Sequence, residues 1–84
     1  MENVETVRKE IDLVDNNILQ QLKRRMELVE KVGKIKQTTT QPIEQTDREN
    51  EIIQRLLANK GNLPSSFIVN VWRVLFDQAK RQQR

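Results

Sequence analysis

Apolar residues recur at intervals of three and four along most of this chain, a spacing typical of α-helices that bury one face. The pattern predicts an all-α fold with three helices, over residues 3–38, 46–59 and 64–83, in a single domain spanning residues 1–84. The longest apolar stripe lies on the first helix and contains Val4, Val7, Ile11, Val14, Ile18, Leu22, Val29, Val32 and Ile35.

Local signals predict where these helices begin and end. The β-branched run 38–40 and the following Pro42 end the first helix, because a residue before proline is biased away from helical geometry. Thr46 and Glu49 match a capping box at the start of the second helix. Pro64 suits the first turn of the third helix, where its missing N–H costs little.

The predicted first helix is too long for a compact monomer. About 36 residues at 1.5 Å each extend roughly 54 Å, whereas a compact domain of this length is about 30 Å across. Because the apolar stripe continues over the whole helix, we predict that a second copy covers the overhang and forms an interlocked, antiparallel homodimer. Gly33 suits a close crossing of two helices, and it equally suits an ordinary tolerated glycine.

Composition narrows the chemistry that this chain can perform. It contains no histidine and no cysteine, which excludes disulfides, zinc sites built on these ligands, and Ser-His or Cys-His catalysis. No apolar run approaches the roughly 18 residues of a membrane span, and the N-terminus lacks the character of a targeting peptide. We therefore expect a cytoplasmic protein with no metal, no cofactor and no membrane partner. The net charge of +3 permits an anionic partner without requiring one.

Two cations lie on the apolar stripe of the first helix. Arg25 stands between Leu22 and Val29, and Lys36 follows eleven positions later, about 20° away around the axis and roughly 16 Å along it. Two long side chains leaning toward each other would leave a gap suited to a small dianion. Snorkelling of each charge to water remains an equal alternative on geometry alone.

Four further polar residues are candidates for the same site. Arg8 lies about 25 Å from Arg25 along the helix and roughly 100° around it, so only an antiparallel partner could bring the two together. Arg48 opposes the helix dipole at the start of the second helix, which hints at a partner. Glu49 and Gln83 have ordinary alternatives, as a capping residue and as a polar helix end respectively.

In order and spacing, the chain resembles the all-helical, AroQ-type chorismate mutases over nearly its whole length. The resemblance rests on "VRKEIDLVDNNILQQLKRRMELVEKVGKIK", then Pro42, then "DRENEIIQRL" and "FIVNVWRVLFDQAKRQQ". It implies a three-helix protomer whose long first helix interlocks with that of a partner, with two active sites per dimer.

The resemblance also implies roles for the cations. Arg25 and the partner subunit's Arg8 would bind the two carboxylates of chorismate. Lys36 and Gln83 would hydrogen-bond the ether oxygen whose bond breaks.

At the other end of the site, the resemblance implies that Glu49 accepts a hydrogen bond from the ring hydroxyl and that Arg48 helps to hold a carboxylate. Two positions depart from the commoner family pattern. Gln45 stands where an aspartate is frequent, and Ala79 stands where a small hydroxyl residue is frequent. The first matters less if the main chain makes the contact, and the second removes one hydrogen bond to substrate.

The implied reaction suits a chain without histidine or cysteine. Rearrangement of chorismate to prephenate, a step of phenylalanine and tyrosine biosynthesis, is intramolecular and needs no nucleophile, so positioning and electrostatic stabilisation suffice. An isochorismate-pyruvate lyase would favour an apolar residue in place of Glu49, whereas an amino-deoxychorismate mutase would keep it. A non-catalytic helical dimer that binds an anionic partner is the alternative from another class. Nucleic-acid binding is disfavoured, because the singled-out cations follow an apolar stripe and no exposed basic patch with stacking aromatics accompanies them.

Overall fold

Three helices make up the chain in the computed structural model, which describes residues 2–38 and 45–82. They are α1 (Val4–Thr38), α2 (Gln45–Ala58) and α3 (Ser65–Gln82). No strand occurs among the described residues, so the predicted all-α fold is confirmed. The helix bounds lie within one residue of the predicted ones, while the predicted loop with Pro42 and the position of Gln83 lie outside the described residues.

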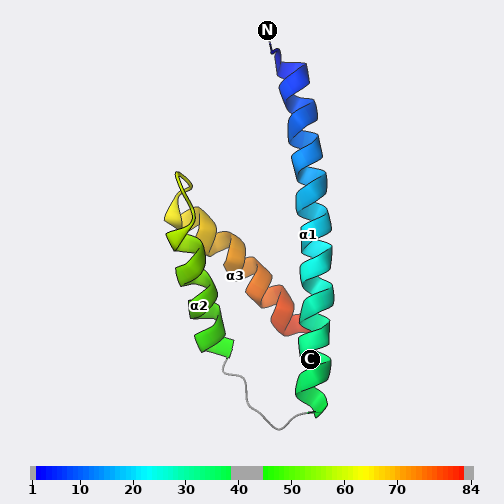
Figure 1. The fold of residues 1–84 in the computed structure, drawn as a ribbon, viewed down its shortest axis with the longest axis vertical. Coiled ribbons are helices and arrows are strands. Elements are labelled where there is room, and N and C mark those ends of the chain that lie inside the picture. The colour runs from blue at the N-terminus through cyan, green and yellow to red at the C-terminus, as the bar shows by residue number, and fades with distance from the viewer. Residues whose placement is uncertain (1, 39–44, 83–84) are drawn as a thin grey trace.

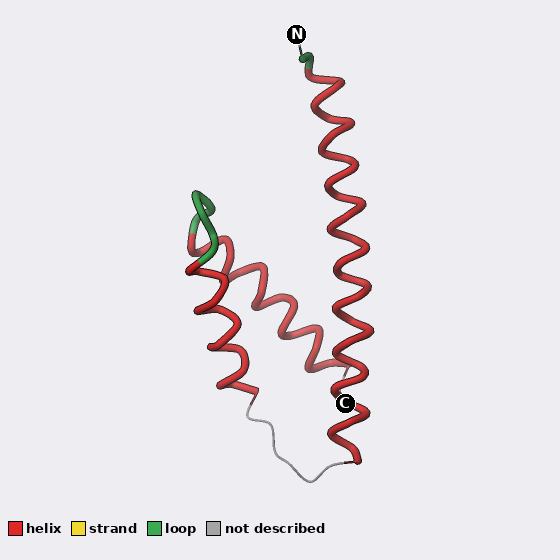
Figure 2. Tube along the Cα trace, in the orientation of Figure 1, coloured by secondary structure: helices red, strands yellow, loops and turns green. Residues whose placement is uncertain are grey.

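α1 begins at a polar cap. The side-chain oxygen of Asn3 accepts a hydrogen bond from the backbone N–H of Thr6 at 2.9 Å, and its carbonyl accepts one from Val7 at 3.1 Å. Glu5 in the first turn and Lys36 in the last complement the helix dipole. The result is the long helix that Figures 1 and 2 show, and the molecule measures 59 Å along its longest axis.

α2 and α3 form a hairpin beside the C-terminal half of α1 (Figure 1). The side-chain amide of Asn59 donates to the carbonyl of Arg55 at 2.8 Å where α2 ends. The turn then passes through Gly61, whose φ of 60° suits glycine, and α3 starts where Ile68 N–H donates to the Pro64 carbonyl at 3.2 Å. α3 contacts both α2 and α1, so it is the element that closes the space between them.

The start of α2 differs from the predicted capping box. The helix begins at Gln45, so Thr46 lies inside the first turn and not before it. The prediction of Thr46 as the cap is therefore wrong, and Glu49 lies one turn into the helix instead of at its third position.

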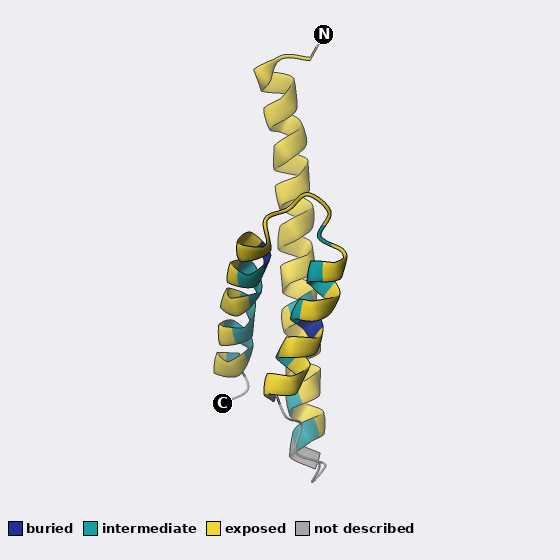
Figure 3. Cartoon of the chain, turned by 90° about the vertical axis from the view of Figure 1, so that its left-hand side faces the viewer, coloured by how far each residue is buried: buried dark blue, intermediate teal, exposed yellow. Residues whose placement is uncertain are grey.

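Very little of the apolar stripe is buried within one chain. Among the described residues only Ile52 and Ile68 are buried, each with 7% exposure. The long apolar side chains of α1 remain exposed, as the yellow N-terminal half of this helix shows in Figure 3. They include Val4, Val7, Ile11, Leu13, Val14, Ile18, Leu19 and Leu22.

The surface area and the shape of the molecule also indicate that one chain leaves much of its apolar surface uncovered. The accessible surface is 7352 Å², about 2,100 Å² more than the roughly 5,200 Å² of a compact monomer of this mass. The radius of gyration is 16.5 Å, against about 12 Å for a compact domain of this length. One chain therefore does not cover its own apolar surface. Within the described ranges, no helix is both long and apolar enough to cross a bilayer.

Candidate active site

A cavity of about 600 Å³ lies between the C-terminal half of α1 and the α2–α3 hairpin. All three helices contribute to its walls, which combine an apolar lining with several charged side chains. The apolar part consists of Leu28, Val29, Val32, Ile52, Trp72, Phe76 and Ala79. The charged part consists of the cations Arg25, Lys36, Arg48, Arg55 and Lys80 and the carboxylate of Glu49. Among the described residues, five cations accompany one carboxylate on apolar walls, which makes a site suited to an anionic ligand.

Arg25 is the most perturbed charge in this cavity. Burial lowers the pKa of its guanidinium because the charged form loses hydration, and the nearby positive charge of Arg48 lowers it further. The guanidinium carbon lies 5.9 Å from the centroid of the Phe76 ring, a cation–π distance. No ion pair to Arg25 occurs in the described part of the chain. An anionic group of a ligand can therefore serve as the counter-charge of its guanidinium.

Glu49 is held from across the cavity. Its Oε1 lies 3.1 Å from Nζ of Lys80, and its side chain is only 25% exposed. The pair joins α2 to α3, whereas the other ion pairs found among the described residues join positions three apart on one helix. Glu49 thus presents its carboxylate to the cavity while one of its oxygens is already paired.

The structure brings five of the residues singled out from the sequence into this one cavity. They are Arg25, Lys36, Arg48, Glu49 and Ala79. Arg25 and Lys36 come from α1 and share its inner face, as their spacing predicts. Arg48 also has an ordinary partner, because its guanidinium donates to Oε1 of Glu51 at 2.6 Å, which accounts for the cation at the start of α2.

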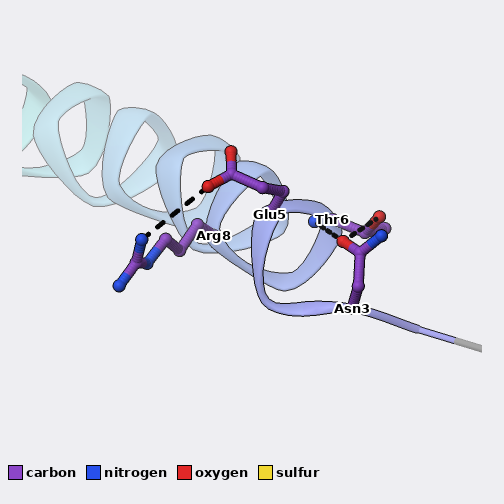
Figure 4. Close-up of polar contacts among 4 residues, drawn as sticks. All are labelled: Asn3, Glu5, Thr6 and Arg8. Atoms are coloured by element: carbon purple, nitrogen blue, oxygen red, sulfur yellow. Dashed lines mark hydrogen bonds and ion pairs between the residues drawn. The ribbon is translucent and has the colours of Figure 1, made fainter.

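Of the remaining three candidates, the structure describes the side chain of Arg8 alone. Arg8 lies near the N-terminal end of α1, exposed and 3.8 Å from Glu5 (Figure 4), and it is not among the lining residues. The side chain of Gln45 and the whole of Gln83 lie outside what the structure describes.

Arg55 and Lys80 line the cavity but were not expected from the sequence. A periodicity signal was present for both. Arg48, Ile52 and Arg55 follow the i, i+4, i+7 spacing of one helix face, and Lys80 stands four residues after Phe76. Neither residue interrupts an apolar stripe as Arg25 does, so both look like ordinary solvated charges in the sequence.

The side chains that the structure describes contain no group of three or more histidine, cysteine, aspartate or glutamate residues placed to hold a metal ion.

Comparison with known proteins agrees with this geometry. The family model described as Chorismate mutase type II matches residues 7–84. The bifunctional chorismate mutase/prephenate dehydratase of Aquifex aeolicus is 37% identical over 78 residues, which cover 87% of this chain and 22% of that protein. The T-protein of Haemophilus influenzae is 37% identical over 75 residues, covering 87% of this chain and 20% of that protein.

A shorter relative aligns with the whole of this chain. The chorismate mutase of Methanocaldococcus jannaschii is 29% identical over 86 aligned positions, covering 100% of this chain and 87% of that protein. In contrast, the chain spans only about a fifth of the length of the Aquifex and Haemophilus relatives. No solved structure was found to match.

Proposed function

The chain belongs to the type II chorismate mutase family, and from this premise we propose that it rearranges chorismate to prephenate in the biosynthesis of phenylalanine and tyrosine. The observation that carries the proposal is the cavity of about 600 Å³ whose described lining residues include five cations and one carboxylate. Its volume falls within the range of roughly 300 to 1,000 Å³ that is usual for small-molecule sites.

The charges match the functional groups of chorismate. The substrate carries two carboxylates, an ether oxygen that gains negative charge as its bond breaks, and one hydroxyl. Arg25 and Arg48 supply cations for the carboxylate end, and Lys36 is the donor for the ether oxygen. The apolar walls exclude water, which strengthens these interactions and holds the reacting ends together. No covalent intermediate, metal or cofactor is required.

A second copy of the chain completes the site in this proposal. The uncovered surface of about 2,100 Å² per chain corresponds to roughly 4,000 Å² in a dimer, a size usual for obligate homodimers. Antiparallel packing of two α1 helices would cover the exposed stripe and carry the partner subunit's Arg8 to the cavity. Arg8 would then bind the second carboxylate together with Arg25 of the first chain.

Three further positions of the proposed site are Gln83, Gln45 and Ala79. Gln83 is the second donor to the ether oxygen. Gln45 contributes through its main chain, and Ala79 leaves one possible hydrogen bond to a carboxylate unmade. The last two lower affinity for substrate without changing the reaction. That residues 1–84 form one domain and that the protein is cytoplasmic remain predictions.

Incubation of the purified chain with chorismate tests the proposal. We expect chorismate absorbance to fall while prephenate accumulates. Pyruvate as the product would replace the mutase with an isochorismate-pyruvate lyase. An unchanged chorismate signal, together with DNA binding that weakens steeply with salt, would instead support a non-catalytic binding protein.

A further inference from the structure

The ion pair between Glu49 and Lys80 lies inside the cavity and joins two helices. Its separation of 3.1 Å between Lys80 Nζ and Glu49 Oε1 is that of a close ion pair. Glu49 is the one carboxylate among the described lining residues, and Lys80 takes one of its oxygens. The carboxylate keeps acceptor capacity for a ligand donor, above all at its second oxygen.

The functional groups of the substrate determine which of them can contact the Glu49 carboxylate. An ionised carboxylate accepts hydrogen bonds and cannot donate them. Chorismate has a single donor, its ring hydroxyl, because its two carboxylates and its ether oxygen are acceptors. If the chain acts on this substrate, the hydroxyl is therefore the group that faces Glu49.

Lys80 changes what Glu49 can discriminate. A lone carboxylate would attract a ligand ammonium more strongly than a neutral hydroxyl. Glu49 is instead neutralised by Lys80, and four other cations line the same cavity. A ligand ammonium at this position would be repelled by these positive charges, whereas a neutral hydroxyl would not be.

We propose that Lys80 is a specificity-determining residue, which makes Glu49 accept a neutral hydroxyl and reject an ammonium at the same ring position. This inference rests on the proposed function and deepens it. It assigns the chain to chorismate and not to amino-deoxychorismate, in which an amino group replaces the ring hydroxyl and is protonated near neutral pH.

The test compares kcat/KM for the two substrates in wild type, Lys80→Met and Lys80→Arg. We expect wild type and Lys80→Arg to prefer chorismate, because both keep a cation beside Glu49. Lys80→Met removes that cation with little change in length, and the preference should shift toward the amino substrate by about tenfold, the size expected for one partly solvated charge at close range.

Arg55→Met is the matched control. It removes one positive charge from the same cavity, but the described contacts of Glu49 do not include Arg55. We expect it to weaken binding of both substrates and to change their ratio much less than Lys80→Met does. Raising the pH through the pKa of the substrate amine should also reduce the preference of the wild type, because the neutral amine no longer meets repulsion. This pH dependence should be smaller in Lys80→Met than in the wild type, and a purely structural role for Lys80 would leave it the same in both.

The outcomes separate this inference from the proposed function. Absence of prephenate formation by wild type would remove the proposed function itself. Prephenate formation with the same substrate ratio in Lys80→Met, or an equal shift in Arg55→Met, would overturn the role of Lys80 alone. If Lys80→Met turns over neither substrate, the ratio of dissociation constants from titration calorimetry decides in the same way, and an unchanged ratio overturns the inference.

Discussion

Replacing Arg25 with methionine should separate catalysis from stability. The side chain is partly buried, and no ion pair to it occurs among the described residues. Its guanidinium packs over Phe76 at 5.9 Å. Methionine has a similar length and can occupy the same apolar wall, including a favourable contact with the ring. The substitution therefore removes the charge while it preserves most of the packing.

The expected loss of activity follows from the proposed role. One preorganised charge that stabilises a transition state is worth about 3 to 4 kcal/mol, so kcat/KM for chorismate should fall by about 10²- to 10³-fold. A chorismate absorbance assay across substrate concentrations measures this directly.

The same Arg25→Met substitution should leave the stability of the protein unchanged or increase it. The pKa of Arg25 is lowered, which means that folding disfavours its charged form. At any pH below that pKa, and therefore at neutral pH, the charge costs stability, and removing it relieves the cost. The loss of the cation–π contact, worth about 0.5 to 1 kcal/mol, offsets part of this gain. Thermal unfolding should show an equal or higher Tm.

Arg24→Met is the matched control, because it removes the same charge from the neighbouring residue. Arg24 is exposed and, among the described residues, pairs with Glu27 at 3.2 Å, three positions away. Activity and stability should therefore each change by less than about 0.5 kcal/mol. Activity close to wild type in Arg25→Met would refute the catalytic role. Destabilisation by more than about 2 kcal/mol would show that Arg25 is structural and that the desolvation argument is wrong.

The remaining predictions concern the ether-oxygen donor and the dimer. Lys36→Ala should lower kcat by about 10²- to 10³-fold with an unchanged helical CD spectrum, and wild-type turnover would contradict its proposed role. Sedimentation equilibrium should give twice the mass of 10.0 kDa. Ile18 is 51% exposed in one chain, but a dimer would bury it. Ile18→Glu should therefore dissociate and unfold the protein, because burying the new charge costs several kcal/mol. A fully folded Ile18→Glu variant would count against the interface. Arg8→Ala and Arg25→Ala chains should each be nearly inactive, yet a refolded mixture should recover about a quarter of wild-type activity, since statistical pairing leaves one intact site in half of the dimers. No recovery in the mixture would mean that the site is not shared between chains.

The sequence determined the helices and the inner face of α1. Periodicity of three and four residues is a local property, so it located three helices within one residue of their observed ends and placed Arg25 and Lys36 on one side. It placed Thr46 before the first turn of α2, whereas the helix already begins at Gln45. The exposure of the apolar stripe on α1 could also be predicted from helix length alone, since two short helices cannot cover a much longer one.

Only the tertiary structure decided which charges surround the cavity. Lys80 and Arg55 stand at positions where a solvated cation is ordinary. Their spacing places them beside apolar positions of α3 and α2, but it does not show that these faces turn toward α1. That choice depends on the turn through Gly61 and on how α3 packs against both other helices. The contact between Glu49 and Lys80 crosses from one helix to another over more than 30 positions in sequence, and local periodicity carries no information about such a pair. The helices and their apolar faces are local properties of the chain, whereas the charge arrangement that selects a ligand arises only when those faces meet.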